Sequence, residues 1–146
     1  MTRASGTSHT DAMELDGSDE PGIRRTLASY CHHVDDGRFT ELVDLFVPEG
    51  CFVVDATPIT GRAELLRFFE ERQGRGEQRG RYLTLNTVVD VTGAVARARS
   101  DFLFLKYVDG QLAVVRAGRY EDELVRIDGT WRFARRRVED WVPADA

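Results

Sequence analysis

The sequence has few cysteines, no excess of basic residues and no long apolar run. Cysteine occurs only at Cys31 and Cys51, which are too few for a disulfide scaffold and lack metal-ligand spacing. The net charge of −5 excludes the positive surface that nucleic acid or an anionic membrane attracts. No apolar run approaches the ~20 residues of a membrane-spanning helix. The N-terminus also lacks the apolar segment of a signal peptide. We therefore expect a cytoplasmic protein with reduced thiols that binds neither nucleic acid nor membranes.

The length and composition of the chain are those of a single globular domain. The chain has 146 residues, and 42% of them are hydrophobic, which is enough for a core. Residues 1–20 are polar and nearly without large apolar side chains, so they cannot offset the entropy of ordering. We expect a disordered tail over residues 1–20, which includes His9, and a single domain over residues 21–142.

The first part of this domain has helical spacing. Pro21 suits the first turn of a helix, with Ser18 or Asp19 as its cap. An apolar face follows, formed by Ile23, Leu27, Tyr30 and Val34. Gly37 is the expected end of this helix because glycine tolerates the left-handed conformation.

Two further helices are expected before the chain turns to strands. Residues 40–46 predict a short second helix, which "PEG" at 48–50 ends. Residues 51–61 predict a short strand and a turn. Thr60 is the expected cap of a third helix over residues 62–73, whose apolar face is Leu65, Leu66, Phe68 and Phe69.

The second half has the period of strands. Residues 81–91 alternate between two faces. One face has Tyr82, Thr84 and Asn86, and the other has Leu83, Leu85, Val89 and Val91. Residues 95–108, 111–127 and 130–141 predict three more strands, joined by "DG" hairpin turns at 109–110 and 128–129. Gly118, in mid-strand, indicates a bulge or a close backbone approach.

Helices followed by strands favour an α+β fold. A strongly curved, mostly antiparallel sheet around the three N-terminal helices would bury both halves and leave a pocket between them. The sequence shows no internal repeat, Walker loop or dinucleotide fingerprint.

The order of these elements resembles the SnoaL-like branch of the NTF2-like superfamily, which includes polyketide cyclases, scytalone dehydratase and bile-acid dehydratases. Five stretches carry the resemblance: "YCHHVDDGRFTELVDLFVPEG", "ITGRAELLRFF", "RYLTLNTVVDV", "AGRYEDELVRIDGTWRF" and "RRVEDW". The resemblance implies an NTF2-like cone, in which three N-terminal helices pack in a strongly curved mixed sheet.

The resemblance also implies site residues. A tyrosine and an aspartate five residues later match Tyr30 and Asp35 in this sequence. The family's histidine at the start of the first long strand is replaced by Tyr82, while Asn86 remains. Catalysis would therefore have to proceed without an imidazole base. Asp35 would move the proton, Tyr30 and Tyr82 would stabilise negative charge on oxygen, and Asn86 would orient the substrate.

For each of these residues a structural alternative stands beside the functional one. Tyr30 could be a core tyrosine and Asp35 a solvated helix end. Asp101, Tyr120 and Phe69 are further candidates for substrate binding, although Asp101 could pair with nearby arginines and Tyr120 could serve packing. His32 is expected to face solvent and His33 to lie on the flank of the helix. Because adjacent helical residues point about 100° apart, we expect no metal site there. The resemblance implies an enzyme that needs no cofactor.

The resemblance implies the function of a cofactor-independent lyase, isomerase or cyclase. By the same resemblance, it would transfer protons on a hydrophobic, oxygenated substrate of polyketide or steroid type. The resemblance also implies a homodimer through the outer face of the sheet. Two alternatives stay open. One is a non-catalytic ligand carrier or oxygenase subunit. The other is epoxide hydrolysis, with Asp35 or Asp101 activating water beside an arginine.

Overall fold

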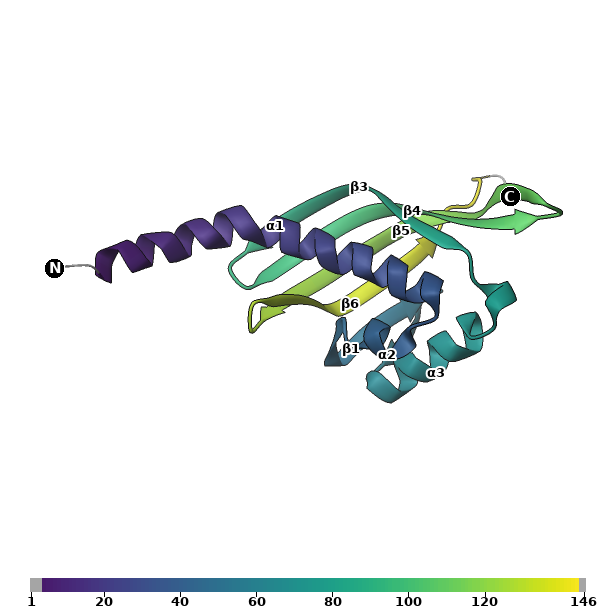
Figure 1. The fold of residues 1–146 in the computed structure, drawn as a ribbon, viewed down its shortest axis with the longest axis horizontal. Coiled ribbons are helices and arrows are strands. Elements are labelled where there is room, and N and C mark those ends of the chain that lie inside the picture. Colours follow the sequence, from purple (N-terminus) through teal and green to yellow (C-terminus); the bar gives the residue numbers. More distant parts are fainter. Residues whose placement is uncertain (1–3, 145–146) are drawn as a thin grey trace.

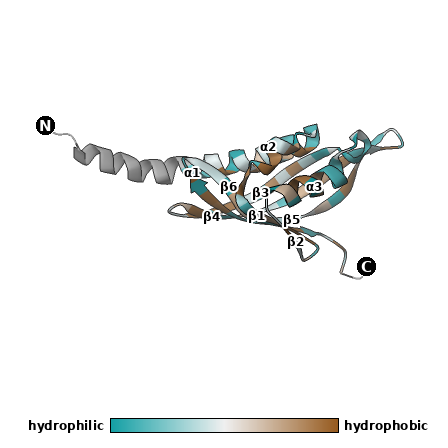
Figure 2. Ribbon diagram, turned by 90° about the horizontal axis from the view of Figure 1, so that it is seen from below, coloured by the Kyte–Doolittle hydropathy of each residue, from teal (hydrophilic) through white to brown (hydrophobic). Residues whose placement is uncertain are grey.

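Three helices cover one face of a six-stranded sheet (Figures 1 and 2). The computed structural model describes residues 4–144, with side chains from residue 19 onward. The helices are α1 (Ala4–Asp36), α2 (Phe39–Val43) and α3 (Arg62–Gln73), followed by a 3₁₀ turn, η1 (Gly76–Gln78). The strands are β1 (Phe46–Val54), β2 (Thr57–Thr60), β3 (Arg81–Thr92), β4 (Val95–Val108), β5 (Gln111–Ile127) and β6 (Thr130–Asp140). The predicted α+β class is confirmed.

The sheet is mixed and mostly antiparallel, as expected. Its strand order is β2-β1-β6-β5-β4-β3, and only the β1–β6 pair is parallel among the described strands. Both predicted hairpins are present. Asp109, Gly110, Asp128 and Gly129 all have positive φ, the combination that a two-residue type I′ turn requires. We call the helix-covered side the inner face of the sheet and the opposite side its outer face.

Helix α1 lies along the inner face through the predicted apolar stripe. Ile23, Leu27, Tyr30 and Val34 are each 3% exposed or less. Gly37 ends the helix with a φ of 71°, and its N–H donates to the Val34 carbonyl. The predicted end of the helix is confirmed.

The beginning of α1 differs from the expectation, because the helix runs through Pro21. Asp19, a proposed cap, is instead buried against the far end of the sheet. Its carboxylate accepts hydrogen bonds from Arg126 at 2.8 Å and from the Trp131 indole at 3.2 Å. These tertiary partners take the place of helix N–H groups. Residues 4–20 belong to α1 and Asp19 is buried, so the expected disordered tail is not found over that range. Residues 1–3 and the side chains of residues 4–18, including His9, lie outside the described part.

Local turn geometry corrects the predicted cap of α3. Thr60 is the last residue of β2 and pairs with Cys51, while Gly61 occupies the N-cap position with a φ of 92°. Residues 46–50, expected to end the second helix, instead begin β1. The chain thus enters the sheet earlier than helical spacing indicates, because the parallel pairing with β6 is not visible in local sequence.

Gly118 shows the close approach that its position in mid-strand indicates. A Cβ at this residue would lie 2.6 Å from the Phe102 ring and closer still to the Glu139 carbonyl oxygen. Phe102 is 1% exposed, so its ring cannot move aside freely. The absence of a side chain at Gly118 therefore lets β4, β5 and β6 pack at this point.

We expect Gly118→Ala to lower the free energy of unfolding by about 1–3 kcal/mol, the usual cost of overpacking a core. Chemical denaturation measures the difference. Gly76→Ala is the matched control, since a Cβ there meets open space. Equal stability of the two variants would contradict the close approach.

Candidate functional site

An aromatic-walled cavity of about 330 Å³ lies between α1, α3, β1 and the inner face of the sheet. Six aromatic side chains line it: Tyr30, Phe52, Phe68, Phe69, Tyr82 and Tyr120. Polar groups also line it: Asp55, Arg72, Gln73, Arg116 and Asp140. Aromatic rings that surround a space together with convergent polar groups are typical of a small-molecule site. Four residues selected from the sequence, Tyr30, Tyr82, Tyr120 and Phe69, meet in this cavity.

Tyr30 reaches the cavity from the buried stripe of α1. Its ring packs edge-on against Phe69, with centroids 6.2 Å apart, and against Tyr120 at 5.9 Å. Burial raises the pKa of the phenol well above its ordinary value. At neutral pH Tyr30 is therefore a protonated donor and not a base.

Tyr82 enters from the start of β3, where its ring stacks on Phe104 at 4.2 Å between centroids. Burial raises its pKa, and the positive charge of Arg116 acts in the opposite direction. Arg116 itself lines the cavity and forms an ion pair with Asp140 at 2.7 Å. Tyr82 is thus a second protonated phenol, beside a guanidinium.

Asp35 lies at the junction of α1 and β3 and does not line the cavity. Its half-buried carboxylate accepts the backbone N–H of Tyr82, at 3.1 Å to Oδ1 and 3.4 Å to Oδ2. Partial burial raises the pKa of Asp35 from 3.8 to about 6, although the Tyr82 hydrogen bond opposes the shift. Asp35 is therefore not the fully solvated helix end of the structural alternative, and burial shifts its pKa toward neutrality.

Asn86 and Asp101 lie on the outer face, away from the cavity. The register of β3 and β4 shifts between Leu85 and Val88, and Asn86 has a φ of 54°. This bulge ends the alternation that would place Asn86 beside Tyr82. Instead the Asn86 amide donates to Asp101 Oδ2 at 2.9 Å, and Arg119 donates to Oδ1 at 2.9 Å. These bonds, Asn86 first, lower the pKa of Asp101.

A buried ion pair that sequence reasoning missed lies beneath the cavity. Arg136 on β6 is fully buried, and its Nε lies 3.1 Å from Oδ1 of Asp122 on β5. Strict alternation from Trp131 and Phe133 would turn Arg136 outward, but a register shift between β5 and β6 reverses the faces. One feature of the sequence could have indicated this reversal. Val138 is apolar and lies two residues after Arg136, so both residues share a face of β6, and Val138 is also buried.

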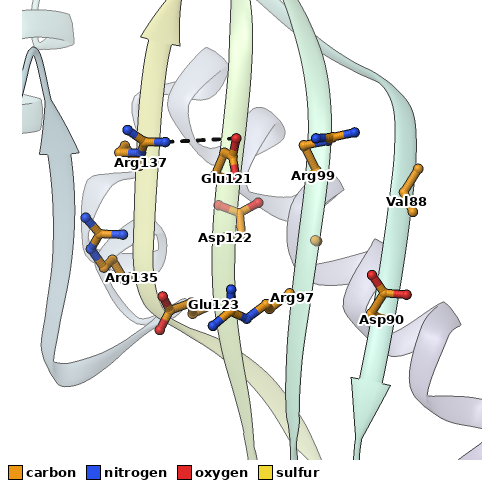
Figure 3. Close-up of a pocket in the computed structure, with 10 residues that line it drawn as sticks. Val88, Asp90, Arg97, Arg99, Glu121, Asp122, Glu123, Arg135 and Arg137 are labelled. Carbon is orange, nitrogen blue, oxygen red and sulfur yellow. Dashed lines mark ion pairs between the residues drawn. The ribbon is translucent and has the colours of Figure 1, made fainter.

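The outer face carries a larger hollow of about 450 Å³ (Figure 3). Its labelled residues are charged except for Val88. The inner cavity is a better candidate for a hydrophobic ligand than this hollow, because aromatic rings form its walls and fewer charged groups line it.

The two described histidines form no metal centre. His32 is exposed and His33 is partly buried, so that desolvation lowers the pKa of His33. No cluster of three or more potential metal-binding side chains occurs within residues 19–144. Among the described helices, none is long and apolar enough to span a membrane.

Asp35→Asn should change stability in a pH-dependent manner. Because the folded state raises the pKa of Asp35 to about 6, the wild type loses stability as pH rises from about 4 to 6 and then levels off. The Asn variant keeps an acceptor for Tyr82 and lacks this loss, so its relative stability should grow over that interval. Denaturation at pH 4, 6 and 8 measures this difference, with exposed Asp36→Asn as the control. A difference independent of pH would contradict the raised pKa.

Comparisons with known proteins agree with this architecture. A Mycobacterium tuberculosis protein of unknown function is 26% identical, with a TM-score of 0.81 over 98% of this chain and 80% of its own. An NTF2-like protein with a cystatin-like fold from Novosphingobium aromaticivorans is 22% identical, with a TM-score of 0.80 over 94% and 90% of the two chains. A Catenulispora acidiphila protein in complex with S-DNPA is 27% identical, with a TM-score of 0.74 over 83% and 92%.

These likenesses confirm the expected NTF2-like fold. No curated protein sequence matches the chain significantly. The model of the SnoaL-like domain matches residues 17–137, which is more than half of the sequence. The chain therefore belongs to the SnoaL-like domain family.

Proposed function

We propose that this protein is a cofactor-independent enzyme that transfers protons on a hydrophobic, oxygenated small molecule. Dehydration, isomerisation and cyclisation of polyketide- or steroid-like substrates are the reactions of this kind. The observation that carries the proposal is the meeting of three phenols, Tyr30, Tyr82 and Tyr120, on one aromatic-walled cavity. Aromatic walls favour flat, hydrophobic rings, and the phenols suit oxygen substituents on them.

The phenols would act as hydrogen-bond donors to a substrate carbonyl. Because burial keeps Tyr30 and Tyr82 protonated, each can donate to an oxygen that gains negative charge as a neighbouring carbon loses its proton. Preorganised donors of this kind stabilise an enolate more than the ketone from which it forms. The cavity thus supplies the hydrogen-bond donors of a proton-transfer site, and a base is needed beside them.

The base in this proposal is Asp35. A carboxyl whose pKa is about 6 can accept a proton near neutral pH and return it. Its bond to the Tyr82 N–H places it next to a cavity residue, at the edge of the site. A substrate that extends past the Tyr82 ring toward the α1–β3 junction would bring a C–H bond to this carboxylate.

The Catenulispora neighbour in complex with S-DNPA supports a ligand-binding role for this architecture. The free thiols Cys31 and Cys51 are consistent with the reducing cytoplasm, where we expect the protein to act.

One observation favours a second candidate, that of a ligand-binding protein without catalysis. The aromatic cavity is present, but the Asp35 carboxyl, the proposed base, lies outside its lining. Epoxide hydrolysis at Asp101 has less support, because this carboxylate and Arg119 lie on the outer face.

Hydrogen exchange in heavy water tests proton abstraction without knowledge of the natural substrate. We expect the protein to exchange the hydrogens next to the carbonyl of a bound polycyclic ketone, as mass spectrometry would show. Tyr30→Phe should slow this exchange by about 10²-fold, the usual effect of removing one donor to a developing oxyanion. Tyr107→Phe is the control, since Tyr107 is 76% exposed and lies outside the cavity.

Asp35→Asn separates the enzyme from the carrier. Loss of the base should lower the exchange rate by about 10²–10⁴-fold while ketone affinity, measured by calorimetry, stays near the wild-type value. Bound ketone with no exchange in the wild type would favour the carrier instead.

We also propose a homodimer through the outer face. Charged side chains form stripes on three adjacent strands: Arg97 and Arg99 on β4, Glu121 and Glu123 on β5, and Arg135 and Arg137 on β6 (Figure 3). Of these six, Arg137 and Glu121 alone form an ion pair with each other within 4 Å, at 3.9 Å. A second copy related by a two-fold axis could set its acidic stripe against a basic one.

Glu121→Lys/Glu123→Lys should abolish such a dimer, because all three stripes become positive. We expect light scattering to show a dimer for the wild type and a monomer for the variant, with unchanged circular dichroism. A monomeric wild type at the same concentration would contradict the interface.

A further inference from the structure

A buried guanidinium lies directly behind two of the cavity phenols. The Arg136 Cζ is 3.5 Å from the centre of the Tyr120 ring and 4.2 Å from that of Tyr30. Both rings line the cavity, whereas Arg136 is fully buried and does not. The positive charge therefore contacts the faces of two rings that themselves line the cavity.

The guanidinium is poorly satisfied for so deep a site. Its Nε, Nη1 and Nη2 have no hydrogen-bond partner among the described residues, although Asp122 lies at ion-pair distance. A buried ion pair of this geometry contributes little to folding, because desolvation offsets its attraction. Buried polar groups without partners are rare in proteins and call for an explanation. A role in the cavity supplies one here.

The Arg136–Asp122 pair has its positive member on the side of the phenol rings. Arg136 lies against the phenol rings, and Asp122 lies at its Nε side. Arg136 accordingly lowers the pKa of Tyr30 more than Asp122 raises it, although burial outweighs both. The remaining groups that act on Arg136 are Tyr30, Tyr120 and the Cys31 thiol, which are neutral when protonated. The cavity thus faces the positive end of the Arg136–Asp122 pair.

We propose that Arg136 is a positioning residue that makes this cavity selective for an oxyanion on a planar ring, such as a phenolate or a cyclic enolate. The ligand oxygen accepts hydrogen bonds from the Tyr30 and Tyr120 hydroxyls, and Arg136 balances its charge through the two rings. This inference rests on the proposed function and adds to it the charge state of the ligand and a residue that acts on it indirectly.

The probe for this proposal is 4-nitrophenol, whose ionised form absorbs visible light. Titration of the bound probe against pH gives its pKa in the cavity, which we expect to be lower than in water. Asp122→Leu/Arg136→Met removes both charges, so that neither is left buried alone. This variant should raise the pKa of the bound probe relative to wild type. The shift should be smaller than the ~1–3 units that follow loss of a single adjacent opposite charge, because Asp122 is removed with Arg136.

Two variants control the measurement. Arg136→Lys keeps a positive charge and should retain most of the lowered pKa. Arg135→Met removes the neighbouring arginine, which is exposed, and should leave the bound probe unchanged. Circular dichroism and thermal unfolding establish that each variant is folded.

Three results would overturn the proposal: a probe that binds to the wild type only as neutral phenol, no binding at all, or an unchanged pKa in the folded double variant. Exchange into ketones distinguishes these failures from failure of the proposed function. If the protein still exchanges ketone hydrogens while 4-nitrophenol binds with no preference for its ionised form, only the role of Arg136 is contradicted. If the protein shows neither ketone exchange nor a preference for the ionised probe, the proposed enzymatic function is contradicted as well.

Discussion

The packing of helix α1 against the inner face of the sheet is the contact on which the cavity depends. Tyr30 projects from this helix into a cluster of rings from four other elements, with edge-on or tilted contacts to Phe52, Phe69, Tyr120 and Phe133. The same contact closes one side of the cavity and places the phenol on its wall. The hydrophobic effect that stabilises the fold therefore also assembles the proposed site.

Two irregularities in the sheet decide which polar side chains can take part. The bulge after Leu85 sends Asn86 to the outer face, where it bonds to Asp101. The register shift between β5 and β6 sends Arg136 inward, under Tyr30 and Tyr120. One displacement removes an expected amide from the cavity, and the other places an unexpected guanidinium beneath it. A single extra residue in a strand reverses all subsequent faces.

Much of the architecture was predictable, because local patterns determine it. The period of 3.6 located the buried stripe of α1, and the period of two with the "DG" turns located β4, β5 and β6 within a residue of their bounds. The cavity residues were only partly predictable. Tyr30, Tyr82, Tyr120 and Phe69 line one cavity, while the Asp35 carboxylate accepts the Tyr82 N–H and does not line it. Its pKa depends on burial between two elements, which no local pattern reveals.

The sequence by itself determined the kinds and order of the elements, since spacing of apolar residues and the chemistry of turns act over a few neighbours. It also determined that the interior would be built mainly from aromatic and aliphatic side chains, without clusters of histidine or cysteine. Only the tertiary structure decided which faces meet, because pairing between distant strands sets register, and register sets direction. Whether a charge lies in water or beneath two phenols follows from that register, and with it the chemistry that the cavity can support.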